Sequence, residues 1–442
     1  MKPATSYPNS LTLRHVDLWT HEGVLENQKI VIERGITQSV VTDTESSQPR
    51  AAIIPLGVDS QVHLRVPGQT QKEDVKTGLS AALYGGYGAF LTMPNTNPVI
   101  DCVEVVEQAN RLIEEQSRAL GVEVKISAAI TLGQKGKELV DFKALTDAGV
   151  VAFTDDGIGV ASDNLMEEAF RAAAEVNLPL LQHAETPGHG GVLAPGPVQK
   201  SLGLQPYADA PEVDMVRRDI EALRKHPKGR YHVLHVSSRH TLDWVKRAKD
   251  EGLNVTAEVS PHHLYFSTED IDAENSAFKM NPPIRSPEDR EALQAALSSG
   301  LIDWVATDHA PHEASAKPLN FDKAAFGTLG LETALGTLLA LQQRGKLSAS
   351  RLVEVFSRAP AKFLGFDDSW GQIKEGKPFR AVALDLSWPD REVKAERLHS
   401  LSRNSCFLGT KLPGLEVAHF NGAGMHLLLE SHAANWIEGL NP

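Results

Sequence analysis

One pattern runs through most of this chain: between about residues 53 and 308, short apolar runs alternate with longer amphipathic stretches. The runs are β-branched or apolar throughout, as expected of strands that are buried on both faces. Eight of them occur, at 53–58, 89–92, 122–129, 150–154, 178–182, 231–236, 253–257 and 303–307. The stretches between them have helical periodicity, and Asp101 and Asp163 are acidic residues suited to helix N-caps. Strands and helices that alternate in this way predict an α/β fold, a (β/α)8 barrel of the TIM type.

The two flanks of this region have a different character. Residues 10–50 show strand-like alternation, and residues 371–430 resume it, for example at Ala381-Val382-Ala383-Leu384. Neither flank is rich enough in apolar residues to fold alone, so we expect the two to pair. We therefore predict a small, discontinuous β-sandwich domain from residues 1–54 and 366–442, and a barrel domain from residues 55–365.

Composition indicates the compartment of the protein and argues against some classes of partner. The 442 residues include two cysteines, Cys102 and Cys406, which excludes a disulfide framework and favours a reducing cytosol. Lys and Arg number 44 against 57 Asp and Glu, and the resulting net charge of −13 argues against nucleic acid or an anionic membrane as a partner. The N-terminus lacks the apolar stretch of a signal peptide, and no apolar run approaches the roughly 18 residues of a membrane span. We expect a cytoplasmic protein.

Candidate metal ligands follow five of the predicted strands. Functional side chains of such a barrel lie at the carboxyl ends of its strands. Here these positions carry three histidines and two aspartates: His63, Asp156, His183, His235 and Asp308. Any one of them alone is more often a structural hydrogen-bonding residue. Five that converge on one end of a barrel are typical ligands of Zn²⁺ or a similar divalent ion.

The segments at these strand ends resemble one known family. The chain is similar to the bacterial dihydroorotases, enzymes of pyrimidine synthesis in the amidohydrolase superfamily, over essentially the whole barrel. The segments that carry the resemblance are His63-Leu64-Arg65, Met93-Pro94-Asn95-Thr96-Asn97-Pro98, Thr154-Asp155-Asp156-Gly157, Ala257-Glu258-Val259-Ser260-Pro261-His262-His263-Leu264, Met280-Asn281-Pro282-Pro283, Ala306-Thr307-Asp308-His309-Ala310-Pro311-His312 and Phe326-Gly327.

The resemblance implies a reaction and a set of site residues. The reaction is the reversible interconversion of N-carbamoyl-L-aspartate and L-dihydroorotate. Metal-activated hydroxide would attack the ring amide, and Asp308 would move the proton as acid and base. The implied ligands are His63 and Asp308 for one metal and His183 and His235 for a second, with Asp156 as the bridge. The implied substrate contacts are Arg65, Asn95 and His312 at the carboxylate and Asn281, Ala325 and Phe326 at the ring.

The chain departs from this family at Gln61. The first barrel strand of the family carries His-x-His, and Gln61 stands at the first of these histidines. A glutamine oxygen is a neutral, weak zinc ligand, so we expect one firmly held zinc and a second site that is weak. Two interpretations follow: an active enzyme adapted to Gln61, or a catalytically silent homologue that acts as a scaffold for aspartate carbamoyltransferase. Retention of the other ligands and of the substrate contacts favours the enzyme.

A hydantoinase or allantoinase is a third interpretation. Those relatives bridge their metals with a carboxylated lysine at the end of the fourth strand, and Thr154 occupies that place here. Arg65 together with Asn95 also indicates a ring that bears an acid. We therefore expect a small-molecule substrate of the dihydroorotate type, and we expect the chain to form a homodimer.

Overall fold

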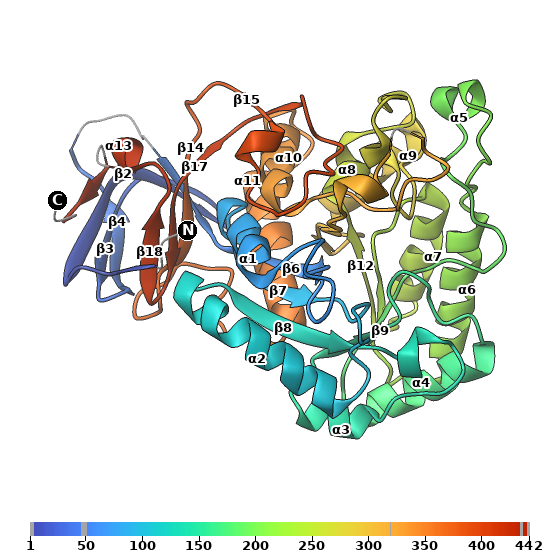
Figure 1. The fold of residues 1–442 in the computed structure, drawn as a ribbon. Helices are drawn as coiled ribbons and strands as arrows, with labels where there is room; N and C mark the ends of the chain where they lie inside the picture. The colour runs from blue at the N-terminus through green and yellow to red at the C-terminus, as the bar shows by residue number, and fades with distance from the viewer. Residues whose placement is uncertain (1–3, 46–50, 319, 434–435, 440–442) are drawn as a thin grey trace.

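The computed structural model describes residues 4–45, 51–318, 320–433 and 436–439. Its centre is an eight-stranded, all-parallel sheet in sequence order, which confirms the predicted barrel fold (Figure 1). Parallel strands covered by helices on the outside are buried on both faces, which explains their continuous apolar character. The strands are β6 (Gly57–Val62), β7 (Tyr87–Thr92), β8 (Glu123–Ala128), β9 (Ala152–Thr154), β10 (Leu180–Gln182), β11 (Tyr231–Val233), β12 (Val255–Val259) and β13 (Trp304–Val305).

One long-range contact closes the barrel. Val62, the last residue of β6, forms a parallel bridge with His309, just beyond β13. The amide of His63 donates to the carbonyl of His309 at 2.9 Å. This closure brings the segment after the first strand against the segment after the eighth, so His63 and Asp308 become neighbours.

A helix follows each barrel strand and covers the outside of the sheet. The covering helices are α1 (Val75–Tyr84), α2 (Val103–Leu120), α3 (Phe142–Asp147), α4 (Asp163–Glu175), α6 (Ala210–Lys225), α7 (Arg239–Asp250), α9 (Pro287–Ser299) and α10 (Leu331–Gln343). Shorter helices are α5 (Pro197–Ser201), α8 (Pro261–Tyr265), α11 (Ala349–Val353), α12 (Ala359–Phe363) and α13 (Glu430–Ala433), with a π-helical turn at Glu354–Arg358 between α11 and α12. Among the described residues, no helix combines the length and the apolar character that crossing a membrane requires.

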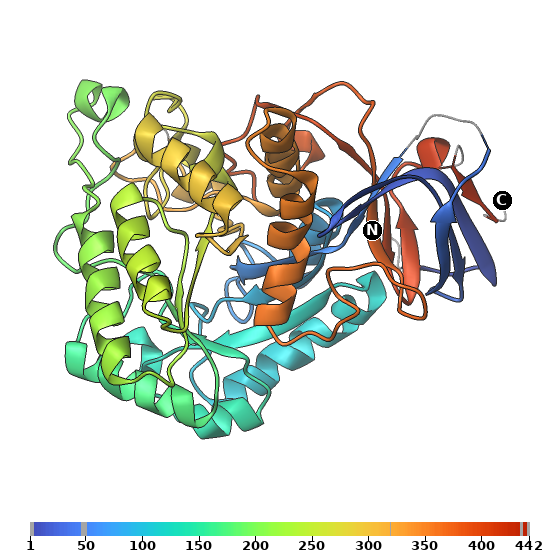
Figure 2. The ribbon, with the colours of Figure 1, turned by 180° about the vertical axis from the view of Figure 1, so that it is seen from behind.

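The two ends of the chain build one nine-stranded sheet beside the barrel, which we call the terminal sheet. In both views strands from the blue N-terminal part and from the red C-terminal part lie side by side (Figures 1 and 2). Strand β14 pairs antiparallel with both β5 and β17, so Val382 lies between Ile54 and His419. The strands are β1 (Thr5–Ser6), β2 (Ser10–Thr20), β3 (Gly23–Glu33), β4 (Ile36–Thr42), β5 (Ala51–Pro55), β14 (Arg380–Asp385), β17 (Leu415–Asn421), β18 (Gly424–Leu427) and β19 (Ile437–Glu438).

Some local predictions were wrong. The apolar run at 53–58 is not one strand: β5 belongs to the terminal sheet, β6 belongs to the barrel, and only Leu56 separates them. The N-cap of α2 is Cys102, and Asp101 instead accepts a hydrogen bond from the amide of Gly133 at 2.7 Å. The N-cap of α4 is Ser162, because its hydroxyl reaches the amide of Leu165, and Asp163 is the first helical residue.

The segment between β15 (Arg391–Glu392) and β16 (Lys411–Leu412) packs on the barrel rather than within the terminal sheet. Phe407 packs against Phe266 and Tyr265, with ring centroids 4.8 and 5.6 Å apart. It is part of a separate apolar cluster that joins this segment to loops of the barrel. The C-terminal part of the chain therefore contributes directly to the loop end of the barrel.

Candidate active site at the carboxyl end of the barrel

A cavity of about 220 Å³ opens at the carboxyl ends of the barrel strands. Ten of the twelve residues that the sequence predicted for the site line it, although they come from segments far apart in the chain. These are His63, Arg65, Asn95, Asp156, His183, His235, Asn281, Asp308, His312 and Phe326; Gly157, Ala310 and Gly327 complete the lining.

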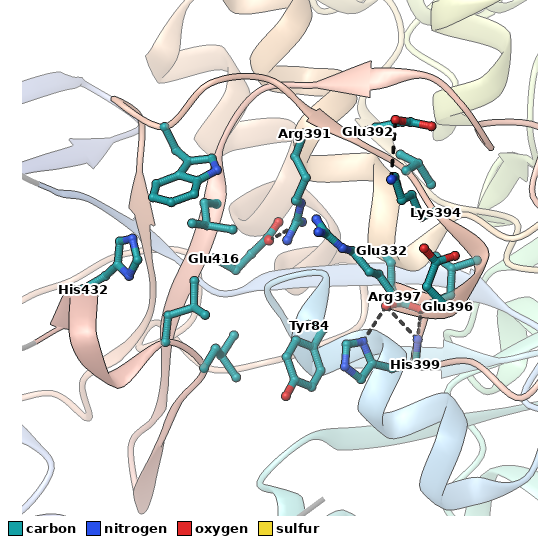
Figure 3. Close-up of a pocket in the computed structure, with 16 residues that line it drawn as sticks. Tyr84, Glu332, Arg391, Glu392, Lys394, Glu396, Arg397, His399, Glu416 and His432 are labelled. Atoms are coloured by element: carbon teal, nitrogen blue, oxygen red, sulfur yellow. Dashed lines mark hydrogen bonds and ion pairs between the residues drawn. The ribbon is translucent and has the colours of Figure 1, made fainter.

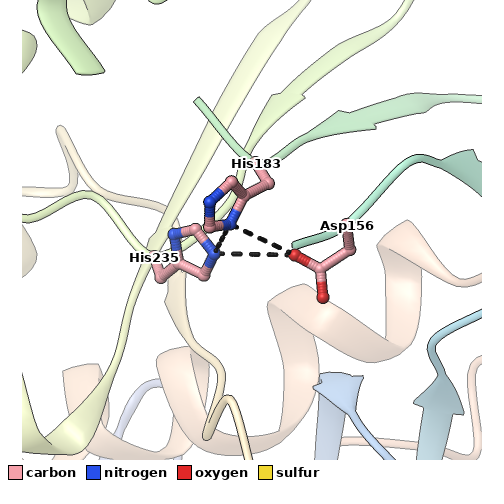
Figure 4. Close-up of side chains that lie close together, drawn as sticks. All are labelled: Asp156, His183 and His235. Carbon is pink, nitrogen blue, oxygen red and sulfur yellow. Dashed lines mark hydrogen bonds and ion pairs between the residues drawn. The ribbon is translucent and has the colours of Figure 1, made fainter. Parts of the chain in front are cut away.

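Three of these side chains form a compact group of ligand atoms (Figure 4). Nδ1 of His183 lies 3.0 Å from Nε2 of His235, and Oδ1 of Asp156 lies 3.5 and 3.7 Å from these two nitrogens. All three side chains are buried, and their candidate ligand atoms lie within 4.8 Å of one another. Two imidazole nitrogens and a carboxylate oxygen are the donor set that Zn²⁺ prefers, so the residues present fit such an ion.

His63 and Asp308 lie beside this group. Nε2 of His63 is 3.2 Å from Oδ2 of Asp156 and 3.2 Å from Oδ1 of Asp308. Its other ring nitrogen is 2.9 Å from Oδ1 of Asn95, which fixes the orientation of the ring. Burial and the charge of Arg65 lower the pKa of His63, but Asp156 and Asp308 outweigh them and raise that pKa to about 9.

Three residues around the cavity hold a left-handed backbone. The φ angles are 63° at Arg65, 31° at His235 and 48° at Asp308, although none of these residues is glycine. Non-glycine residues rarely adopt this region, and such strain is typical of sites where side-chain placement matters more than local stability. The tight backbone turns these side chains into the cavity immediately after their strands.

Arg65 is a buried cation without an anionic partner. Its guanidinium contacts the carbonyl oxygen of Pro311 at 3.3 Å and Nε2 of His312 at 3.4 Å, and it forms no ion pair among the described residues. Burial lowers the pKa of Arg65 to about 10, so it remains charged at neutral pH. Burial, and then the charge of Arg65, lower the pKa of His312 to about 3, so its ring is neutral there. This wall of the cavity therefore presents a positive charge without a direct ion pair, on which Asp308, Asp156 and Glu73 act only from a longer distance.

Two further residues beside the cavity were not predicted from the sequence. Glu185 accepts a hydrogen bond from Nδ2 of Asn281 at 2.7 Å and lies 3.3 Å from Nε2 of His183. The Tyr207 hydroxyl donates to Oδ1 of Asn281 at 2.9 Å. Glu185 thus contacts the nitrogen of His183 that faces away from Asp156, a typical arrangement for the outer partner of a metal ligand. Its position two residues after His183 was the available signal.

Two predicted residues do not line the cavity. Gln61 is fully buried in β6, and neither atom of its side-chain amide has a hydrogen-bond partner among the described residues. Ala325 also lies outside the lining, since its amide donates to the carbonyl of Ala316 at 2.7 Å and its own carbonyl accepts from Nζ of Lys317 at 2.7 Å. The backbone that reaches the cavity is that of Phe326 and Gly327 instead.

The residue next to Asp156 has a different environment. One oxygen of the Asp155 carboxylate accepts from the amides of Ile130 and Thr131 at 2.8 and 3.1 Å, and the other accepts from the Thr131 hydroxyl. All of its contacts thus serve the loop after β8. Asp156 is the one of the two aspartates that faces the cavity.

A larger cavity, of about 560 Å³, lies away from this site (Figure 3). It lies between α1, α10 and the terminal sheet, and several of its charged groups pair with one another. Arg391 donates to Glu416 at 2.9 Å, and His399 contacts Glu332 at 2.8 Å. It contains none of the candidate ligands, so the smaller cavity remains the candidate active site.

Comparisons with known proteins agree with this arrangement. Residues 52–414 match the model of the amidohydrolase family. A dihydroorotase of Geobacillus kaustophilus is 38% identical over 415 residues, which cover 91% of this chain and 95% of that protein. A dihydroorotase of Lactiplantibacillus plantarum is 42% identical over 368 residues, 82% of this chain and 84% of that protein. The solved structure of the L-hydantoinase (dihydropyrimidinase) from Arthrobacter aurescens shares the fold, with a TM-score of 0.81, 24% identity and coverage of 94% of this chain and 97% of that one.

The chain therefore belongs to the amidohydrolase family. Both relatives named above are dihydroorotases, which confirms the predicted resemblance and the predicted class, a hydrolase of cyclic amides. The candidate metal site in the barrel agrees with such an enzyme.

Proposed function

We propose that this chain interconverts N-carbamoyl-L-aspartate and L-dihydroorotate, the ring-closing step of pyrimidine synthesis. The observation that carries the proposal is the unpaired guanidinium of Arg65 in the wall of the cavity that also contains the candidate ligands. A buried charge without a partner is costly, so this position favours an anionic ligand. The carboxylate of dihydroorotate fits, because an arginine fork binds a carboxylate with two parallel hydrogen bonds.

The proposed metal ligands form two unequal groups. Asp156, His183 and His235 would hold one zinc ion, and His63 and Asp308 would hold a weaker second one, for which Gln61 offers only an amide oxygen. A zinc ion held by these residues would lower the pKa of water toward neutrality and polarise a carbonyl group. The buried and unpaired amide of Gln61 supports a role for its oxygen toward such an ion.

Proton transfer falls to Asp308 in this proposal. In ring opening, Asp308 accepts a proton from the water that adds to the ring carbonyl, and the carbon–nitrogen bond of the amide breaks. Asp308 then delivers the proton to the departing nitrogen, and ring closure reverses these steps. Its Oδ1 faces Nε2 of His63 at 3.2 Å, so Oδ2 is the oxygen that would take the proton. Arg65 and His312 hold the carboxylate of the substrate, while Asn281 and Phe326 hold its ring.

A substrate panel tests this function. We expect the purified protein to hydrolyse dihydroorotate, to close N-carbamoyl-L-aspartate in the reverse direction, and to leave hydantoin and allantoin unchanged. Turnover of hydantoin with none of dihydroorotate would favour the hydantoinase alternative. No turnover of any of these compounds, together with a stable complex with aspartate carbamoyltransferase, would favour the scaffold alternative.

A further inference from the structure

Residues 399–407 connect the C-terminal part of the chain to the loops around the active site. At its beginning, the amide of His399 donates to Glu332 at 2.8 Å. The Ser400 hydroxyl donates to the buried carboxylate of Glu73, and the Ser402 hydroxyl donates to the carbonyl of Lys72 at 2.7 Å. The segment thus forms hydrogen bonds with the loop that follows β6 before it reaches the loop that follows β13.

Asn404 lies in the middle of this segment and is almost completely buried. Its Oδ1 accepts from the amide of His312 at 3.0 Å, and its Nδ2 donates to the carbonyls of Ala310 at 2.9 Å and Gly327 at 3.2 Å. All three partners line the cavity of the candidate active site, whereas Asn404 itself does not. One side chain therefore ties together the two stretches of backbone that form the wall beside Arg65.

The local packing leaves little freedom for this wall. A Cβ atom added to Gly327 would lie 2.8 Å from Cβ of Ala310 and 3.2 Å from Cδ2 of His312. The two stretches are thus in close contact, and their separation depends on what holds their backbones. A side chain at this position must supply one acceptor and two donors at once, which asparagine does and which neither aspartate nor leucine can do.

We propose that Asn404 is a positioning residue for substrate binding: it holds the backbones of His312 and Gly327 in the geometry that receives the carboxylate-bearing side of the ring. The inference rests on the proposed function, in which His312 and Arg65 bind that carboxylate. Asn404 acts through these residues and does not touch the substrate. Its effect therefore falls on substrate binding more than on the chemical step.

Kinetics of Asn404→Ala provide the first test. Loss of three buried hydrogen bonds leaves unsatisfied backbone groups, so we expect KM for dihydroorotate to rise about tenfold or more while kcat changes less. Asn404→Asp retains the acceptor for His312 but lacks both donors, so we expect its KM to remain above the wild-type value. Asn421→Ala is the matched control, because Asn421 also makes three hydrogen bonds, but with Leu120, Ala423 and Gly424 in and next to the terminal sheet. An unchanged KM in Asn404→Ala, or the same change in Asn421→Ala, would overturn the inference.

Hydrogen–deuterium exchange provides a second test that does not depend on turnover. Without Asn404 the amide of His312 loses its acceptor, so exchange in peptides covering residues 309–328 should become faster in Asn404→Ala and remain unchanged in Asn421→Ala. Unchanged exchange in these peptides would contradict the positioning role even if the wild-type chain proved inactive. Faster exchange in Asn404→Ala, beside a wild type that shows no turnover, would retain the positioning role and reject the proposed function.

Discussion

Nδ1 of His183 faces Nε2 of His235 across 3.0 Å, at the ends of two neighbouring barrel strands. Asp156 adds a carboxylate oxygen within 4 Å of both nitrogens, and all three side chains are buried. Burial raises the pKa of Asp156, but contacts with His183, His235 and His63 outweigh burial and bring this pKa well below its usual range. Asp156 therefore supplies a negative charge. One divalent cation would satisfy all three groups at once, because both nitrogens and the carboxylate oxygen can donate lone pairs to it.

Removing one of these nitrogens should remove the metal. We expect His235→Ala to lose its zinc during dialysis under conditions in which the wild-type protein retains about one zinc per chain. Inductively coupled plasma mass spectrometry measures the content. His240→Ala is the matched control, since His240 is exposed on α7 and contacts Asp209 at 2.6 Å, away from the cavity. Equal zinc in the two variants would contradict the assignment.

Restoring an imidazole at position 61 should strengthen the second metal site. The side-chain amide of Gln61 is buried and unpaired among the described residues, so a histidine there would meet no existing hydrogen bond that it must replace. Zinc prefers imidazole to an amide oxygen, so Gln61→His should raise the retained zinc from about one to about two per chain. Zinc titration against a competing chelator measures both affinities. A stoichiometry that stays at the wild-type value would show that Gln61 does not occupy a ligand position.

Glu185 should contribute to metal affinity through His183. Burial raises the pKa of Glu185, but its contacts with His183, Tyr207 and Asn281 bring that pKa to about 2, so it is ionised beside the ring. Outer partners of this kind typically affect metal affinity or activity by about 10- to 100-fold, and we expect a weakening in that range for Glu185→Gln. Competition with a chromogenic chelator gives the affinity. The exposed Glu269, changed to Gln, serves as the control, and equal affinities would assign Glu185 a purely structural role.

Arg65 should govern recognition of the substrate carboxylate. Arg65→Lys retains the charge but loses the planar fork, and hydrogen bonds to charged groups contribute about 1.5–3 kcal/mol. We therefore expect KM for dihydroorotate to rise about 10- to 100-fold. Dihydrouracil, which lacks the carboxylate, is the control substrate, and we expect any turnover of it to change little. A parallel loss for both substrates would mean that Arg65 shapes the cavity without binding the carboxylate.

His419 should make stability depend on pH. It lies in β17, and its Nε2 is 3.1 Å from the carbonyl of Tyr87 in the barrel; burial, with a smaller contribution from neighbouring His426, lowers its pKa from 6.5 to about 3. Between these two values the unfolded chain binds a proton that the folded chain excludes. The free energy of unfolding therefore falls as pH falls below 6.5, by up to about 1.4 kcal/mol per pH unit for this group.

His419→Gln retains a donor for the Tyr87 carbonyl and cannot take up the proton. Urea denaturation at pH 7 and pH 5 should therefore show a smaller loss of stability in the variant than in the wild type. The exposed His189, changed to Gln in the same way, is the control for removal of a histidine. Identical pH dependence in His419→Gln and wild type would contradict the assignment.

Much of the barrel was predictable because each buried strand leaves a continuous apolar run, and the ligands could be found because they directly follow those runs. The first run failed for a physical reason. Strands β5 and β6 belong to different sheets but follow one another with only Leu56 between them, so no polar break marks the change.

The residues that the sequence did not predict form hydrogen bonds between loops that are distant in the chain. Glu185 acquires its environment from Asn281, 96 residues away, and Asn404 binds the amide of His312 across 92 residues. No spacing rule connects such positions, since their contact depends on how the loops fold over the barrel. Gln61 is the reverse case, because its departure from the family was visible in the sequence while its burial without a hydrogen-bond partner required the structure.

Metal-dependent turnover of dihydroorotate tests the central claim most directly. The initial rate of dihydroorotate hydrolysis would be measured for the protein as purified, after removal of metal by a chelator, and after addition of zinc, beside Asp308→Asn prepared in the same way. We expect turnover that is lost with the metal, returns with zinc, and falls by at least about 100-fold in Asp308→Asn. No turnover in the zinc-loaded wild type, or equal turnover in Asp308→Asn, would contradict the account.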